Sequence, residues 1–207
     1  MKVNRRTFIS STAAAVGTTR LTTASQRSGA NDQIGVALIG CGGMGRADIR
    51  DFMRVPEVQV RAVCDVWEHN LERAARMTED QPSGRAAGFT DFRRVLELKE
   101  IDVVVVATPD HWHALPTIMA CEAGKDVYVE KPLSLTVEEG RKMVEAARRN
   151  QRVVQMGTQQ RSGLHYQEAV RLIQDGVIGK ISRVSAWNYE NETPAGIGNP
   201  PDGNPPS

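Results

Sequence analysis

A glycine array between an apolar run and an amphipathic stretch places the strongest constraint on how this chain folds. In IGVALIGCGGMGRADI, Gly40, Gly42 and Gly45 follow the β-rich run 34–39 and precede a helical pattern over 44–53. Glycine allows the sharp turn after the strand and lets the helix pack close to the sheet. The array therefore predicts a phosphate-binding loop that opens a helix, and a tight turn without a ligand is the alternative.

The alternation of apolar runs and helical patterns continues along the chain. Further strands are expected at 58–64, 102–107, 126–130 and 152–156, and further helices at 67–77, 91–98, 113–123 and 136–150. Asp91 is placed as an N-cap, and Gly124 as a C-cap. Thr136 and Glu139 have the spacing of a capping box. The pattern predicts an α/β fold, a Rossmann-like doubly wound parallel sheet with helices on both faces.

An acidic residue closes the strand after the glycine array. Asp65 lies twenty residues beyond Gly45, where a carboxylate accepts hydrogen bonds from the adenosine ribose hydroxyls. It would repel a 2′-phosphate, and the next basic residue, Arg73, lies well inside the following helix. We therefore expect a dinucleotide site that prefers NAD to NADP, with Gly43 and Met44 completing the loop.

The run 126–130 ends abruptly in Glu130, Lys131 and Pro132. In open parallel sheets, ligands bind outside the carboxyl ends of the strands. Lys131 is therefore expected at the rim of a binding site, and a solvated Lys-Pro turn is the alternative.

Four segments together resemble the glucose–fructose oxidoreductase and inositol dehydrogenase family (Gfo/Idh/MocA). They are GCGGMG at 40–45, VVVATPDHWHA at 104–114, EKPLSLTVEEG at 130–140 and GTQQRSG at 157–163. The resemblance covers residues 34 to about 189. It implies a nucleotide-binding half followed by a substrate half built on an antiparallel sheet. It also implies hydride transfer between a nicotinamide and a sugar- or cyclitol-like alcohol.

The resemblance assigns roles to individual residues. It makes Lys131 the catalytic lysine, whose ammonium holds the substrate hydroxyl and stabilises the alkoxide-like charge as hydride leaves. The cofactor positions that it implies are Thr108, Pro109, His113, Glu130 and Gln159. It places Arg161 near the substrate, with a surface charge as the alternative. His111 is either site lining or surface, and His165 is expected to be an ordinary surface histidine.

The sequence departs from the family in its second domain, which is almost absent. A helix ending near Gly176 and an alternating strand at 181–189 predict only the start of an incomplete α+β substrate domain over 158–190. The stretch 191–207 is rich in proline and glycine, which excludes a helix or a central strand. The proton-accepting histidine that family members bring from their second domain has no counterpart here. We therefore expect a truncated chain, and an inactive dinucleotide-binding fragment is the alternative to a working oxidoreductase. Association into a homo-oligomer is expected only of a full-length form.

Residues 1–30 differ from the rest. They hold five of the 26 basic residues and no acidic one, and NRRTFIS followed by a mild apolar run resembles a twin-arginine export signal. Export to the periplasm of a protein folded and loaded with cofactor is the expectation, and a disordered basic tail is the alternative. The remaining residues carry a net charge of about −4, which argues against a nucleic-acid partner.

Three cysteines, Cys41, Cys64 and Cys121, are too few and too scattered for a disulfide framework. They lack metal-ligand spacing, so we expect three small buried side chains and no metal site. No apolar run approaches the ~18 residues that a membrane span needs.

Overall fold

The computed structural model describes residues 33–187 of the 207-residue chain. All the pairs in its six-stranded sheet are parallel, and the strand order is β3-β2-β1-β4-β5-β6. The strands are β1 (Ile34–Ile39), β2 (Val58–Cys64), β3 (Ala87–Phe89), β4 (Val103–Val106), β5 (Asp126–Glu130) and β6 (Val154–Gly157). This is the order of a Rossmann-like sheet, so the predicted fold class is confirmed.

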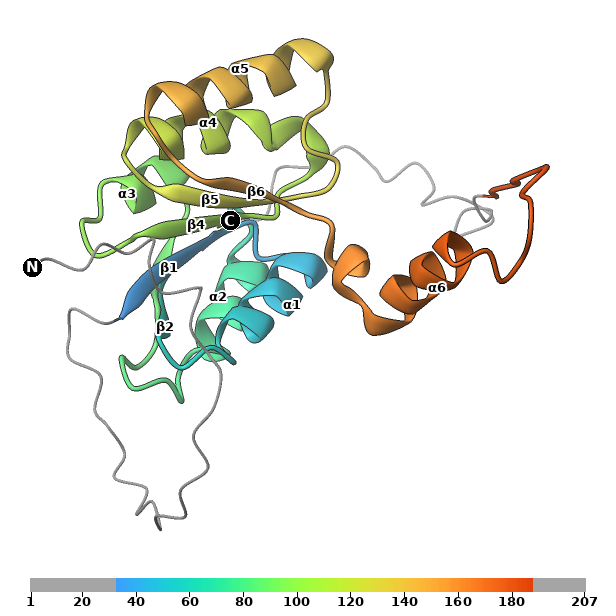
Figure 1. Ribbon diagram of the computed structural model, residues 1–207. Coiled ribbons are helices and arrows are strands. Elements are labelled where there is room, and N and C mark those ends of the chain that lie inside the picture. The colour runs from blue at the N-terminus through green and yellow to red at the C-terminus, as the bar shows by residue number, and fades with distance from the viewer. Residues whose placement is uncertain (1–32, 188–207) are drawn as a thin grey trace, which may run out of the picture.

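Helices cover both faces of the sheet (Figure 1). The helices are α1 (Gly43–Phe52), α2 (Glu68–Arg76), α3 (Phe92–Leu96), α4 (Ala114–Glu122), α5 (Val137–Arg149) and α6 (Leu164–Gln174), with short 3₁₀ turns η3 (Asp110–Trp112) and η4 (Gln159–Ser162). In Figure 1, α4 and α5 lie above the sheet, and α1 and α2 lie below it. The predicted helices at 44–53, 67–77, 91–98, 113–123 and 136–150 are confirmed to within two residues at each end.

Alternation along β1 divides the interior into two cores. Ala37 and Ile39 join the core beneath α3, α4 and α5, whereas Val36 and Leu38 join the core beneath α1 and α2. Because successive side chains of a strand point to opposite faces, a central strand of this sheet is apolar on both sides. This explains the uninterrupted apolar runs at 34–39 and 103–106 and fixes the sheet between two helical layers.

The predicted helix ends are also confirmed. Asp91 accepts a hydrogen bond from the Arg93 backbone N–H. Thr136 and Glu139 form the reciprocal capping box that starts α5. Gly124 follows α4 with a φ of 76°, the left-handed conformation that glycine adopts readily.

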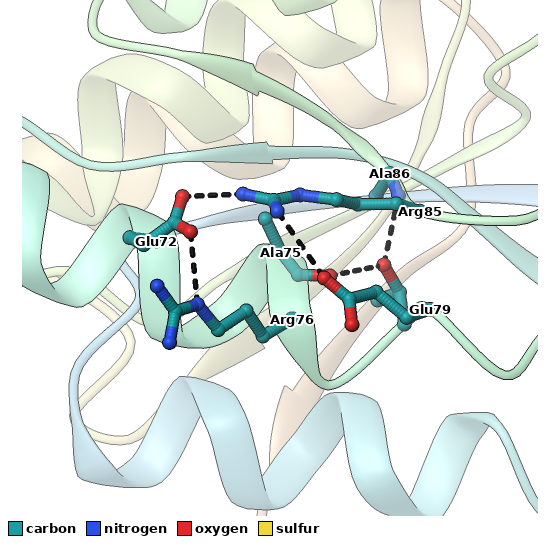
Figure 2. A network of polar contacts seen from close by, with 7 residues as sticks. Glu72, Ala75, Arg76, Glu79, Arg85 and Ala86 are labelled. Atoms are coloured by element: carbon teal, nitrogen blue, oxygen red, sulfur yellow. Dashed lines mark hydrogen bonds and ion pairs between the residues drawn. The ribbon is translucent and has the colours of Figure 1, made fainter.

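Strand β3 was not predicted, and the segment that leads to it is held by side chains. Figure 2 shows Arg85 between the carboxylates of Glu72 and Glu79, with Arg76 also paired to Glu72. Beneath these exposed pairs, the buried Thr78 hydroxyl accepts from the Ala86 backbone N–H at 2.8 Å. The network ties the chain back onto α2 just before β3 pairs with β2.

The chain beyond β6 packs less closely against the rest of the protein. Helix α6 buries none of its residues and extends away from the sheet (Figure 1). The prediction of a strand at 181–189 is wrong for residues 181–187, which have no regular secondary structure. Among the residues that the structure describes, no strand lies beside the apolar–polar alternation of 181–187 to pair with it. Residues 188 and 189 lie outside the described part of the chain. The leader and the proline- and glycine-rich stretch lie outside the described residues, and the described helices include none that is long and apolar enough to span a membrane.

Candidate nucleotide and active site

The glycine loop lies at the point where the strand order reverses. Strand β1 pairs with β2 on one side and with β4 on the other, so the loops after β1 and β4 diverge to opposite faces. Gly40 begins the loop with a φ of 93°, and its N–H donates to the Cys64 carbonyl at 2.8 Å. In open α/β sheets this crevice is where nucleotides bind.

The first turn of α1 is prepared for an anion. Its N-cap is Gly42, which provides no side-chain hydrogen bond, and the first turn has no acidic residue. Helix α5, in contrast, has a capping box and two acidic residues in its first turn. A Cβ at Gly42 or Gly43 would meet no protein atom within 4 Å, so both backbones face open space. The loop can therefore accept a pyrophosphate on its free N–H groups.

Beside the loop lies a pocket of about 370 Å³ at the carboxyl ends of β1, β2 and β4. Its walls bring together residues that the sequence singled out separately, namely Gly40, Asp65, Thr108, Pro109 and His111. Sequence reasoning missed the aromatic part of the wall, Phe92 and Trp112, whose rings stand edge to face at 6.4 Å. The pocket has the size and the mixed polar and aromatic lining that suit a nucleoside.

Asp65 fixes the loop as well as facing the pocket. Its Oδ2 accepts from the Cys41 backbone N–H at 2.7 Å, and its Oδ1 accepts from the Trp67 backbone N–H at 2.8 Å. Each carboxylate oxygen keeps a second lone pair for a ribose hydroxyl. Asp65 therefore links the strand end to the glycine loop and remains able to take its predicted role.

Thr108 has a spare polar atom. Its Oγ1 is buried without a hydrogen-bond partner among the described residues, although Thr108 lines the pocket. Buried hydroxyls are normally hydrogen-bonded, so an orphaned one beside a pocket indicates a place for a ligand group. This is an independent sign that the site fits a dinucleotide.

His113 lies behind the pocket wall rather than on it. The ring is 1% exposed, with Nδ1 2.6 Å from the Pro132 carbonyl oxygen and Nε2 2.8 Å from the Thr108 carbonyl oxygen. It thus bridges the loop after β4 and the loop after β5. Its geometry supports a residue that holds the site together.

The residues expected around the reacting centre gather at the end of β5. Lys131 is exposed, and its backbone N–H donates to Oε2 of the buried Glu130 at 3.2 Å. Gln159 of η4 donates through Nε2 to Glu130 Oε1. Arg161 and His165 are exposed and farther along the chain. The structure therefore joins three of the predicted residues directly and leaves Arg161 outside this cluster.

Asp48 is the member of this cluster that sequence reasoning missed. It lies on α1, is 5% exposed, and its Oδ1 accepts from Gln159 Nε2 at 3.4 Å. Burial and the neighbouring Glu130 raise the pKa of Asp48 from 3.8 to about 7. Burial of the Tyr128 hydroxyl, followed by the nearby carboxylates of Asp48 and Glu130, raises the pKa of Tyr128 to about 12. The sequence gives one weak signal, an acidic residue one helical turn beyond Gly45 on the sheet-facing side.

Asp48→Asn should stabilise the protein at alkaline pH. Because the folded state raises the pKa of Asp48, it binds more protons than the unfolded chain between about pH 4 and pH 7, and stability is lost as pH rises through that window. Asparagine retains an acceptor for Gln159 and never ionises. We expect a gain of about 1–4 kcal/mol in the free energy of unfolding near pH 8 and little gain near pH 4.

The measurement for Asp48→Asn is urea unfolding at both pH values. Asp80→Asn is the control, since Asp80 is an exposed carboxylate that does not act on Asp48. An Asp48→Asn variant whose stability tracks that of the wild type across the range would show that Asp48 is ionised throughout.

The three cysteines are free and buried, as predicted. Burial, followed by the nearby Asp65 carboxylate, raises the pKa of the Cys41 and Cys64 thiols. Cys64 lines the pocket, and Cys41 Sγ is 3.4 Å from the Cys64 carbonyl oxygen. Thiols of raised pKa are poor nucleophiles, so these side chains are structural.

The fold and the site define a dinucleotide-binding α/β protein. Residues 34–158 match the family model described as the oxidoreductase family with an NAD-binding Rossmann fold, GFO_IDH_MocA. The match spans more than half of the chain, so the protein belongs to this family. The resemblance drawn from the four sequence segments is confirmed.

Individual relatives show how much of the family the chain represents. A glycosyl hydrolase family 109 protein of Shewanella sp. (strain W3-18-1) is 31% identical over 154 residues, 72% of this chain and 34% of that protein. The myo-inositol 2-dehydrogenase of Lactobacillus plantarum is similar with a TM-score of 0.65 at 27% identity, over 72% of this chain and 43% of that chain. The WlbA dehydrogenase of Bordetella pertussis, in complex with NADH and UDP-GlcNAcA, is similar with a TM-score of 0.64 at 25% identity. The similarity covers 72% of this chain and 42% of that chain. The chain therefore spans about a third of the length of the curated relatives it matches.

Proposed function

We propose that the chain supplies the NAD-binding half and the lysine of an oxidoreductase that transfers hydride to or from a sugar- or cyclitol-like alcohol. The observation that carries the proposal is the arrangement of one edge of the sheet. There the open glycine loop, the pocket with Asp65 and the unpartnered Thr108 hydroxyl, and Lys131 after β5 all lie at the carboxyl ends of the parallel strands. Of the similar solved structures, one holds NADH and UDP-GlcNAcA, and another is named as a myo-inositol 2-dehydrogenase.

The roles follow from the geometry. NAD, when bound, accepts or donates the hydride. The backbone of Gly42 and Gly43 would hold its pyrophosphate, and Asp65 and Thr108 would hold an adenosine ribose. Lys131 is free of any side-chain ion pair among the described residues, and an ammonium at the strand end can stabilise a developing alkoxide. Glu130 fixes the backbone from which that ammonium extends.

The test is oxidation of a panel of sugars and cyclitols by the whole chain with NAD⁺, followed by NADH absorbance. Formation of NADH that disappears in Lys131→Ala would support the proposal. Lys142→Ala is the matched control, because Lys142 is an exposed lysine paired with Glu138 on α5. Equal turnover in wild type and Lys131→Ala would overturn the role of Lys131.

A second candidate function is hydrolysis of a glycoside with the NAD kept in place. The names of the curated relatives favour it, and NAD-dependent glycosidases are a known exception to the two-carboxylate mechanism. In that case aryl glycosides should release their phenol with NAD⁺ present, without accumulation of NADH. Phenol release that is independent of NAD⁺ would contradict this candidate.

Asp65→Ser should narrow the preference for NAD over NADP. Loss of the carboxylate removes an acceptor for the ribose hydroxyls and the repulsion of a 2′-phosphate. We expect the ratio of the two affinities to move toward NADP by about tenfold, or ~1.4 kcal/mol. Serine retains an acceptor for the Cys41 N–H. Titration with NADH and NADPH measures the ratio, and an unchanged ratio would count against the ribose role.

We also propose export by the twin-arginine route, supported by the paired arginines in NRRTFIS and the mild apolar run that follows. Fusion of residues 1–30 to a folded reporter, with Arg5 and Arg6 changed to lysine as the control, tests it. Retention of both fusions in the cytoplasm would contradict the proposal. Oligomer formation by a longer form stays a prediction.

A further inference from the structure

A buried polar cluster joins the helix of the glycine loop to the strand that ends at Lys131. Asp48 on α1 is 5% exposed, and Glu130 at the end of β5 is 4% exposed. Gln159 of η4 donates through Nε2 to Asp48 Oδ1 at 3.4 Å and also to Glu130 Oε1. One side-chain amide therefore bridges two buried carboxyl groups from elements far apart in the sequence.

Both oxygens of Glu130 are occupied. Oε1 accepts from Gln159, and Oε2 accepts from the backbone N–H of Lys131 at 3.2 Å. Strand β6 closes the other side, since a Cβ added at Gly157 would lie 2.5 Å from Glu130 Oε1 and 3.0 Å from the Tyr128 hydroxyl oxygen. The Glu130 carboxylate is thus confined, and its position fixes the backbone of Lys131.

Asp48 differs from Glu130 because its Oδ2 is buried without a hydrogen-bond partner among the described residues. Among residues 33–187, none of the groups that act on it carries a positive charge. Strand β5 presents Glu130 and Tyr128, its own helix presents Asp51, and η4 presents only the neutral amide of Gln159. An ionised Asp48 would draw the Gln159 amide toward itself and repel Glu130, whereas a neutral Asp48 accepts more weakly and leaves Gln159 to Glu130.

We propose that Asp48 is a positioning residue for Lys131. In its neutral form, it lets Gln159 hold Glu130 against the Lys131 backbone, and its ionisation displaces Glu130 and loosens that segment. The proposal extends the proposed function, which gives Lys131 its role toward substrate. The raised pKa of Asp48, about 7, puts the change within the range in which the protein can be studied.

The experiment measures hydrogen exchange at the Lys131 backbone amide by NMR, in the whole chain without cofactor. Protection, corrected for intrinsic exchange, reports the hydrogen bond to Glu130 directly. We expect wild-type protection to fall about tenfold between about pH 6 and pH 8.5 as Asp48 ionises. Asp48→Asn should keep the low-pH protection throughout, and Asp80→Asn, which removes an exposed carboxylate that does not act on Asp48, should behave as the wild type.

A purely structural role for Asp48 would not produce this pH profile. Identical profiles in wild type and Asp48→Asn would overturn the proposal. If Asp48→Asn does not fold, the variant Gln159→Leu tests the proposal instead. Loss of the bridge should remove protection of the Lys131 amide at both pH values. Unchanged protection in Gln159→Leu would overturn the proposal as well. Failure of the chain to bind NADH would count against the proposed function and leave the exchange result standing.

Discussion

Gly42→Val is expected to abolish dinucleotide binding and to leave the fold intact. The structure separates the two effects, because a Cβ at Gly42 meets no protein atom within 4 Å. The open space in front of Gly42 is where the pyrophosphate approaches the backbone N–H groups at the start of α1. A valine side chain would occupy that space. We expect the affinity for NADH to fall by at least about 100-fold, or ~3 kcal/mol.

The measurement for Gly42→Val is a fluorescence titration with NADH beside a thermal unfolding curve. An unfolding midpoint close to that of the wild type shows that binding, and not folding, has been lost. Gly42→Ala gives a graded control, because its single methyl group fills less of the same space. Wild-type affinity in the valine variant would contradict the assignment of the loop.

Gly45→Ala is expected to have the opposite outcome and to cost the fold itself. A Cβ at Gly45 would lie 2.1 Å from the Gly40 carbonyl oxygen, 3.1 Å from Leu38 Cδ1 and 3.2 Å from Ala107 Cβ. The nearest of these atoms belongs to the backbone and cannot rotate away, so α1 must shift off the sheet. We expect a loss of about 3–5 kcal/mol in the free energy of unfolding, a large part of the stability of a small domain.

Urea denaturation of Gly45→Ala beside Gly43→Ala makes the comparison. Gly43 lies in the same helix, has open space around it and does not have a positive φ, so alanine there should change stability by less than about 1 kcal/mol. Equal midpoints for the two variants would show that α1 does not pack against Gly40 as described.

Most of the architecture was predictable because it rests on local chemistry. The run 34–39 is apolar on both faces and the run 126–130 on one face, and both begin and end where predicted. The capping box at Thr136 and the glycine after α4 made the helix ends predictable in the same way. These signals are contained in a few neighbouring residues, and the surrounding fold agrees with them.

The errors have a common physical origin in long-range pairing. Strand β3 is three residues long and is held by β2 and by the contacts of Arg85 and Thr78 rather than by its own pattern. The stretch 181–187 has the alternation of a strand but pairs with none of the strands between residues 33 and 187, so it is irregular. A strand is stable only beside another, and a short pattern cannot show whether that partner exists.

The site was predicted residue by residue, and its connections were not. Gly40, Asp65 and Thr108 were singled out separately, and the sheet order brings them to one pocket. Asp48 was missed, since charged residues surround it along α1, and its burial beside Glu130 and Gln159 depends on segments far away in the sequence. His113 was predicted at a helix start and in the cofactor pocket; it precedes α4 as its N-cap and is buried between two carbonyl oxygens.

The measurement that tests the central claim most directly is a titration of the whole chain with NADH and with NADPH, followed by fluorescence. The open glycine loop and the carboxylate of Asp65 predict saturable binding with NADH bound more tightly than NADPH. Binding of neither cofactor would contradict the assignment of this edge of the sheet as a dinucleotide site. Tighter binding of NADPH would contradict the role given to Asp65.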